Sequence, residues 1–425
     1  MTTARFGNWY YGWNVLGTAM LFQAAVYGFT VYTFTFWVEP WVGEFGAARG
    51  EIMLAMFFAQ VLSGAVAPFA GRAFDVLSMR HVIAAALLFF GLCQILVSFA
   101  TAVWQIVALY ALFTAVGLVA AGSMAGQILA VRWFASRRGL AMGWVATGTS
   151  IGGFALPPLV ATLLVSFGWR TAHVIVGLSV LFIVLPIVYL LVRNAPSQTD
   201  LATQAAPAAA DSNHPAWSTA SILRSRDFWA VILVVVPLLT AFSAVQMNLA
   251  PIARDLGVGA QQAAFMMSLL SGTMIGGKLF FGAMADRWDL RPLFALSLIC
   301  MASGLLLLNG SPSYSLLLLA SVMFGLAVGG YLPLLGAVIG ARFGSASFGR
   351  VRGLTWPFIT LSAIGAPLAG MLRDLTGSYQ GALWLFFATL GISVLAVAVL
   401  MRPSRAPVLA PIVAAKAVAA KPEAS

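Results

Sequence analysis

The stretch GRAFDVLSMR at residues 71–80 returns 211 positions later as GAMADRWDLR at residues 282–291. Both copies read Gly-x3-Asp-x4-Arg, and both follow a long apolar run. A charged turn that stands at the same place in each half of the chain indicates a duplicated unit of structure.

The composition indicates a membrane protein. Of 425 residues, 61% are hydrophobic and 8% are charged, whereas soluble domains contain roughly 25% charged residues. A bilayer-crossing helix needs about 20 apolar residues, and runs of that length recur along the chain. We therefore predict an all-α membrane protein whose twelve transmembrane helices form two six-helix bundles related by pseudo-twofold symmetry.

The predicted helices cover residues 11–37, 50–70, 80–100, 103–130, 139–166, 171–193, 228–252, 262–284, 292–310, 313–340, 350–372 and 379–401. The pairs Gly148-x3-Gly152 and Gly272-x3-Gly276 have the small-residue spacing that allows helix backbones to approach closely. We expect tight helix packing at both pairs.

The basic residues predict the orientation. With both termini in the cytoplasm, most Lys and Arg fall on the cytoplasmic side, in agreement with the positive-inside rule. We place Arg72, Arg80, Arg132, Arg342, Arg350 and Arg352 there, and Arg49, Arg170, Arg254 and Arg373 outside. We expect a multi-pass protein of the plasma membrane, the inner membrane in a bacterium. The net charge of +11 then needs no nucleic-acid partner.

Four segments follow from these patterns. Residues 1–194 form the N-terminal bundle, residues 227–402 the C-terminal bundle, and residues 195–226, rich in Ala, Ser, Pro and Thr, a cytoplasmic linker. Residues 403–425 have a similar composition and read as a disordered tail.

The repeat extends beyond the charged turn. Arg132 matches Arg342 at an offset of 210, and Pro158-Leu159 matches Pro367-Leu368 at 209. Arg138-Gly139-Leu140 matches Arg352-Gly353-Leu354 at 214. Two parallel six-helix repeats are the arrangement of the major facilitator superfamily. Residues 8–402 resemble that superfamily, whose usual marker is the loop motif. The superfamily commonly has a basic residue directly after the aspartate of this motif. The first copy has Val76 at that position, and the second copy keeps a basic residue, Arg287.

The loop motif has two possible roles. Glycine permits close packing, an aspartate can accept hydrogen bonds from a helix N-terminus, and an arginine can pair across the cytoplasmic face. One interpretation is a static turn with topogenic charge; the other, which the resemblance favours, is a latch that steadies the outward-open state. The latch would comprise Gly71, Asp75, Arg80, Gly282, Asp286, Arg287, Arg291, Arg137 and Arg138.

A second stretch narrows the family. WFASRRGLAMG at residues 133–143, followed by Gly148 and Gly152, resembles the helix 4 to 5 signature of monocarboxylate and oxalate/formate transporters. Tyr11-Gly12-Trp13 is similar to the helix 1 motif of the same group. The resemblance implies a secondary carrier of small organic anions, with monocarboxylates the first choice, that works by alternating access.

Lys278 is the candidate anion-binding residue. A charge inside a membrane helix is a functional hypothesis by default, although the side chain could instead snorkel to the surface. Lys278 lies four residues before Gly282, where related organic-anion carriers have an arginine that binds substrate carboxylate. A single positive charge at the site matches the single negative charge of a monocarboxylate. Val31 stands where animal-type carriers have a lysine, and only neutral residues surround Thr355, where oxalate carriers have another.

Proton coupling stays open. We find no acidic residue at mid-membrane, and Met274 stands where animal-type carriers have an aspartate. Because burial disfavours a charged lysine, Lys278 could itself release a proton. Proton symport, uniport and anion exchange are all compatible with the sequence.

Other polar residues of helices 1, 4, 7 and 10 are candidates to bind substrate or merely to join helices. They are Gln23, Tyr27, Ser123, Gln127, Gln246, Asn248 and Tyr331. Trp144 and Trp356 could wall an apolar substrate tail or pack in the core.

Several classes are not supported. Cys93, Cys300 and the three histidines lack metal-ligand spacing, and no phosphate-binding loop occurs. We expect that the protein is not an enzyme and that it binds no metal and no cofactor. We also expect a monomer. Its partners would be a small organic anion, the lipid bilayer and, if transport is coupled to protons, protons. The alternatives are an exporter of hydrophobic or amphiphilic compounds and a non-transporting membrane sensor.

Overall fold

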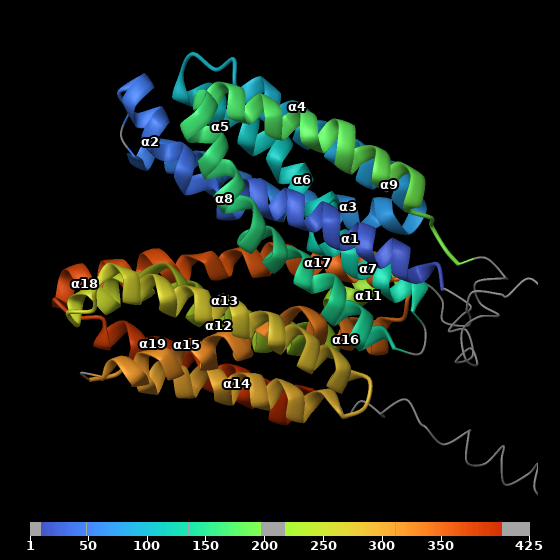
Figure 1. Cartoon of the computed structure of the whole chain (residues 1–425). Coiled ribbons are helices and arrows are strands. Elements are labelled where there is room, and N and C mark those ends of the chain that lie inside the picture. Colours follow the sequence, from blue (N-terminus) through green and yellow to red (C-terminus); the bar gives the residue numbers. More distant parts are fainter. Residues whose placement is uncertain (1–9, 48, 135–136, 197–216, 311, 402–425) are drawn as a thin grey trace, which may run out of the picture.

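The computed structural model describes residues 10–47, 49–134, 137–196, 217–310 and 312–401. Every regular element in these ranges is a helix, as Figure 1 shows. The predicted tail and residues 197–216 of the predicted linker lie outside the described residues. The end of that linker is a short helix, α11 (Thr219–Arg224).

The first half of the chain forms the first bundle. Its helices are α1 (Gly12–Tyr27), α2 (Phe34–Phe45), α3 (Arg49–Val76), α4 (Met79–Val97), α5 (Val103–Leu109), α6 (Ala115–Ala120), α7 (Ser123–Trp133), α8 (Arg138–Ser179) and α9 (Leu185–Leu191). Short π-helical segments continue α1 through Gly28–Tyr32, join α5 to α6, and join α8 to α9.

The second half forms the second bundle. Its helices are α12 (Arg226–Asp255), α13 (Ala260–Ala285), α14 (Leu290–Leu307), α15 (Tyr314–Gly329), α16 (Tyr331–Phe343), α17 (Phe348–Leu361), α18 (Gly365–Thr376) and α19 (Gln380–Leu395). In Figure 1 the two bundles lie one above the other.

The helices are long and apolar enough for twelve membrane crossings. Eleven helical stretches of the described residues qualify, and one of them, Arg138–Leu191, has 54 residues. A single crossing needs about 20. Gly168, with φ of 73°, breaks this stretch into two helices because it adopts a backbone conformation that favours glycine. Each bundle therefore has six crossings, as predicted, and the chain is a multi-pass membrane protein.

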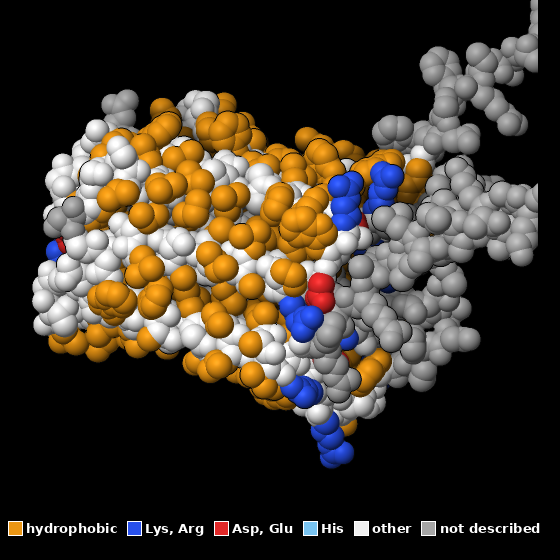
Figure 2. All heavy atoms as spheres, turned by 90° about the horizontal axis from the view of Figure 1, so that it is seen from below, with side chains coloured by type: hydrophobic (Ala, Val, Ile, Leu, Met, Phe, Trp, Pro, Cys, Tyr) orange, Lys and Arg blue, Asp and Glu red, His pale blue; other side chains and the backbone are white. Residues whose placement is uncertain are grey.

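Two helix pairs join the bundles. α13 of the second bundle packs along α8 of the first, and α17 of the second packs along α3 of the first. The ends of α3 and α13 and the starts of α8 and α17 lie at one end of the molecule, which we call the basic end. We define it by the turns at residues 77–78, 286–289 and 344–347 and by the first residue of α8, Arg138. On the face seen in Figure 2, most Lys and Arg side chains gather toward one end of the molecule.

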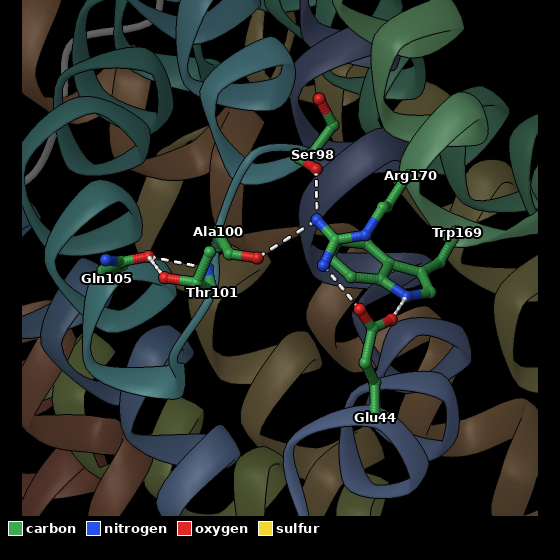
Figure 3. A network of polar contacts seen from close by, with 7 residues as sticks. All are labelled: Glu44, Ser98, Ala100, Thr101, Gln105, Trp169 and Arg170. Atoms are coloured by element: carbon green, nitrogen blue, oxygen red, sulfur yellow. Dashed lines mark hydrogen bonds and ion pairs between the residues drawn. The ribbon is translucent and has the colours of Figure 1, made fainter.

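At the opposite end of the molecule, charged side chains bind groups of their own bundle. Glu44, at the end of α2, accepts hydrogen bonds from Arg170 at 2.5 Å and from the indole of Trp169 (Figure 3). The same guanidinium donates to the carbonyls of Ser98 at 2.5 Å and Ala100 at 3.1 Å. The Arg170 hydrogen bond holds the pKa of the Glu44 carboxyl below its usual value, against the effect of desolvation. These contacts tie three segments of the first bundle to one another.

Close glycine packing occurs at one of the two predicted pairs. A Cβ on Gly148 would lie 2.6 Å from the carbonyl oxygen of Met20, and one on Gly152 would lie 2.3 Å from that of Ala24. These two glycines let α8 lie directly against α1. The prediction is wrong for Gly272 and Gly276, which have no atom within 4 Å of such a Cβ. The four-residue spacing identifies a helix face without saying whether another helix covers it.

Replacing Gly152 with valine should therefore disturb the first bundle. The new side chain would push α8 away from the backbone of α1, and overpacking of this kind costs about 1–3 kcal/mol. Gly276→Val, also within a membrane helix, is the matched control. Thermal unfolding in detergent should show a lower Tm for Gly152→Val and a nearly unchanged one for Gly276→Val. Equal Tm values would contradict the packing role of Gly152.

Candidate functional site

The aspartate of the second loop motif binds the start of a helix in the other bundle. Asp286 directly follows α13, and its carboxylate accepts hydrogen bonds from the backbone N–H groups of Gly139 at 2.6 Å and Leu140 at 2.9 Å. Both amides belong to the first turn of α8, where N–H groups have no partner within the helix. The positive end of the helix dipole also favours the negative charge. Burial raises the pKa of Asp286, whereas these hydrogen bonds lower it.

The first loop motif makes the same kind of contact. The Asp75 carboxylate accepts a hydrogen bond from the backbone N–H of Arg350 at 3.0 Å, in the first turn of α17. Glycine makes both approaches possible. A Cβ on Gly71 would lie 2.3 Å from the Gly349 carbonyl oxygen, and a Cβ on Gly282 would lie 2.6 Å from that of Gly139. The two motif copies thus hold the bundles together at the basic end.

The contacts correct the alignment of the repeats. Gly139 opposes Gly282 just as Gly349 opposes Gly71, so Gly139 corresponds to Gly349 at an offset of 210. The predicted match with Arg352-Gly353-Leu354 is shifted by one helical turn. The next glycines show the same register: Gly143 lies against the backbone of Lys278, and Gly353 lies against that of Ala67.

The arginines that end the two motifs do not pair across the bundles as predicted. Arg80 donates from Nε to the carbonyl of Val192 at 2.8 Å and lies over the Tyr189 ring, all within the first bundle. Arg291 pairs with Asp289 at 3.4 Å, two residues away. Each guanidinium binds an acceptor in its own bundle. This contact does not depend on how the two bundles are placed relative to each other.

The other basic latch candidates lie around Asp286. Arg137 and Arg138 flank the start of α8, and both positive charges act on the Asp286 carboxyl. Arg287 is exposed. The positive charge at this contact therefore comes from the helix start and its two arginines.

Lys278 lies inside the interface between the bundles. Its side chain is 3% exposed. The ammonium Nζ donates to Ser150 Oγ at 2.6 Å, to Thr149 Oγ1 at 2.8 Å and to the Ala146 carbonyl at 3.0 Å. All three acceptors belong to α8, and they use all three ammonium protons. Lys278 thus points into the protein and does not reach the surface.

Arg352 is a second buried cation, and its predicted place at the surface is wrong. We expected it on the cytoplasmic face, but it is 0% exposed. Its Nε donates to Gln127 Oε1 at 2.9 Å, and its guanidinium lies 4.8 Å from the centre of the Trp356 ring. Nη1 lies 3.4 Å from Thr355 Oγ1, and Nη2 is buried and makes no hydrogen bond with the described residues. One signal was available: Arg352 stands four residues after the start of α17, a full turn inside it.

Several predicted polar residues surround Arg352. Gln127 also donates from Nε2 to the Leu332 carbonyl at 3.0 Å, so it contacts two helices of the other bundle. Tyr27 and Tyr331 lie close enough to Arg352 for its positive charge to interact with their hydroxyl groups. The hydroxyl of Tyr27 lies 3.4 Å from Ser123 Oγ.

Gln23 connects the surroundings of the two cations. Its Nε2 donates to the carbonyl of Val145 at 3.0 Å, next to the Ala146 carbonyl that binds Lys278. The same nitrogen lies close to Gly126, which precedes the Arg352 partner Gln127. Its Oε1 is buried and makes no hydrogen bond with the described residues.

Three other predicted residues are not among the hydrogen-bond partners of Lys278 or Arg352 within the described part of the chain. Asn248 bonds the carbonyls of Ala244 and Ala366 within the second bundle. Gln246 is half-buried on α12, and Trp144 is 40% exposed on α8. Trp356, by contrast, donates to Ser63 across the interface at 3.2 Å.

Residues 20–250 and 234–423 match the sequence model of the Major Facilitator Superfamily. The chain belongs to this superfamily. The fold agrees: the proton:xylose symporter XylE aligns over 93% of this chain and 97% of its own, with a TM-score of 0.69 at 14% identity. The human organic anion transporter MFSD10 gives 0.69 at 15%, over 91% and 99% of the two chains.

The curated relatives of this superfamily member include monocarboxylate transporters. Monocarboxylate transporter 12 of Mus musculus is 30% identical over 324 residues, which cover 68% of this chain and 64% of the relative. The chain thus spans less than two thirds of that relative's length. Monocarboxylate transporter 13 of Rattus norvegicus is 26% identical over 381 residues, 88% of this chain and 84% of its own.

Removing the charge of Asp286 should open the basic end. Asp286→Asn weakens two hydrogen bonds to a charged group, each worth about 1.5–3 kcal/mol, so the ratio of closed to open molecules should fall about tenfold or more. A cysteine at Met142, which is buried against Gly336 across the interface, reports opening through maleimide labelling in a background without Cys93 and Cys300.

Asp289→Asn is the control, because Asp289 caps α14 through the Arg291 amide at 3.0 Å. Faster labelling is expected in Asp286→Asn and in Asp75→Asn only. An unchanged labelling rate in both variants would show that the contacts do not hold the end closed.

Proposed function

We propose that this transporter carries small organic anions across the plasma membrane by alternating access, with Lys278 as the group that attracts the anion. The names of the curated relatives make monocarboxylates the first substrates to test. An exporter of neutral hydrophobic compounds would not need a buried cation at this position.

The observation that carries the proposal is the charge balance at Lys278. Its three hydrogen-bond partners are two hydroxyls and a carbonyl, all of them neutral. Among the described residues, no acidic side chain forms an ion pair with it. A buried cation without a counter-charge is costly, and an anionic substrate would supply that charge.

The position of Lys278 couples anion binding to the movement of the bundles. Its partners Thr149 and Ser150 lie on α8 of the first bundle, whereas Lys278 itself lies on α13 of the second. A carboxylate bound to the ammonium would compete with these hydroxyls and loosen the interface. Occupancy of the site would in this way favour the change from a closed to an open basic end.

The charge distribution supports the orientation. With the basic end in the cytoplasm, the positive-inside rule is obeyed, both termini are cytoplasmic, and the closed basic end corresponds to an outward-facing state. The proposed site and both aspartate contacts lie within one chain, which suits a monomer. Among the described residues no carboxylate is as deeply buried as Lys278, and Asp75 and Asp286 accept hydrogen bonds from backbone N–H groups at the basic end. In a proton symport we therefore expect the proton to travel on Lys278 or on the substrate.

Uptake into proteoliposomes tests the assignment. With radiolabelled acetate, propionate and lactate as probes, Lys278→Ala should reduce uptake at least about tenfold, because the anion loses its only point charge on α13. Lys278→Arg should retain part of it. Arg72→Ala, which removes an exposed arginine near the basic end, is the control and should transport normally.

Each outcome decides the proposal. Uptake by Lys278→Ala at the wild-type rate would reject Lys278 as the anion site. Failure of the wild type to take up acetate, propionate or lactate would reject small monocarboxylates as the substrate class.

A further inference from the structure

The turn of the first loop motif is apolar at a position where the second copy is charged. After its aspartate the second copy continues with Arg287, whereas the first copy continues with Val76 and Leu77. Val76 is 72% exposed and Leu77 is 58% exposed. The contact between Asp75 and α17 uses neither side chain. Exposed apolar side chains grouped at one place indicate a surface that another apolar molecule covers.

Leu77 also lines an apolar groove in the first bundle, which we call the α3–α4 groove. α3 and α4 both pack against α6, and the groove has a volume of about 500 Å³. Phe69 is 76% exposed, so the groove opens on the surface of the bundle. Its apolar lining comes from all three helices and includes Phe69, Ala73, Ala85, Phe89, Val116 and Ala120.

The groove faces the bilayer and not the other bundle. All three helices belong to stretches that are long and apolar enough to cross a membrane. α3 meets α17 through Gly64, Ala67 and Gly71, whereas Phe69 and Ala73 lie on another face of the helix. The hydrocarbon core of a bilayer contains no water. A lipid chain is therefore the molecule that can fill an apolar groove on this surface.

Polar side chains stand at one end of the groove. Ser78 and His81 line it next to the turn at the basic end. The ring of His81 lies 6.1 Å from the ring of Tyr189, which Arg80 covers at 5.5 Å. Within the described part of the chain, Arg80 donates from Nε to Val192 and forms no ion pair. Its other N–H groups can thus bind an anion.

We propose that the α3–α4 groove binds an anionic phospholipid of the cytoplasmic leaflet. One acyl chain lies along Phe69 and Ala85, and the phosphate lies at His81 and Arg80. The lipid tail alone gives no preference, because all lipid tails are as apolar as the groove. The headgroup decides the class of lipid, since basic pockets between membrane helices on the cytoplasmic side bind anionic headgroups.

A second groove shows what the headgroup site adds. It lies between α14 and α19 in the second bundle and has a volume of about 400 Å³. Its lining includes Ala302 and Phe387, and within the described residues every lining residue is apolar. We expect this groove to accept acyl chains of any phospholipid equally. It therefore supplies a control for the α3–α4 groove.

Photocrosslinking in proteoliposomes tests the proposal. The probes are phosphatidylglycerol and phosphatidylcholine with identical tails, each carrying a diazirine and used at the same mole fraction in phosphatidylcholine vesicles. Labelled peptides are identified by mass spectrometry. The ratio of phosphatidylglycerol to phosphatidylcholine labelling should be roughly fivefold higher near Phe69 and Phe89 than near Phe182, the gain given by one cation near the surface. Phe182 is 74% exposed in a membrane helix and serves as the reference.

Three variants assign the parts of the site. Arg80→Gln should lower the phosphatidylglycerol preference to that of the reference peptide, and Arg80→Lys should retain it. Ala85→Phe should fill the groove and reduce labelling near Phe69 by both lipids. Ala302→Phe, the same change in the second groove, should leave the labelling near Phe69 unchanged.

The outcomes decide the proposal independently of substrate transport. Equal preferences at the groove and at the reference peptide would show a general lipid coat and overturn the site. A preference that survives in Arg80→Gln, or labelling that survives in Ala85→Phe, would overturn the assigned position of the lipid. If Arg80→Gln does not fold, the wild-type ratio and Ala85→Phe still give the decision. Failure of Lys278-dependent uptake would leave the lipid site intact.

Discussion

A cation inside a membrane protein is costly unless most of its N–H groups are bound, because the hydrocarbon core of the bilayer offers no water to replace a lost partner. The contact between the two bundles is arranged around this constraint. Lys278 takes all its acceptors from α8, and Arg352 takes its best one from α7. The bundles therefore cannot separate at these points without exposing charge to a new environment. The group that would hold an anion, Lys278, is also one of the groups that hold the bundles together.

The fold followed from local features of the sequence. Apolar runs of the length of a bilayer and two copies of one charged turn are visible without knowledge of tertiary contacts, and both led to the two six-helix bundles. The main error in the prediction concerned the start of α17, which begins at Phe348 and not at residue 350. Arg352 stands one turn inside that helix, and one turn decides whether a basic residue near a helix end reaches water or lies in the interface.

The candidate site could be predicted only where a single residue stood out in the sequence by its charge or its repetition. Lys278 stood out because it is charged within an apolar run, and Asp75 and Asp286 stood out because they are repeated. By contrast, Gly276 and Gly152 have the same spacing to their preceding glycines, yet only Gly152 meets another helix. Arg80 and Arg291 were expected to pair across the bundles, but acceptors in their own bundles bind them. Which face of a helix is covered, and which of several acceptors is nearest, depends on the assembled bundle.

The aspartate contacts at the basic end are made to backbone amides, and this has a consequence for how the two halves could diverge. Any residue except proline supplies the N–H group that the carboxylate needs, so the receiving turn can change its side chains at every position except the glycine that lies against the other bundle. The two receiving turns are Arg138-Gly139-Leu140 and Phe348-Gly349-Arg350, which share only the glycine. A duplicated gene could thus lose most of the resemblance between its halves and still keep the same mechanical joint in both.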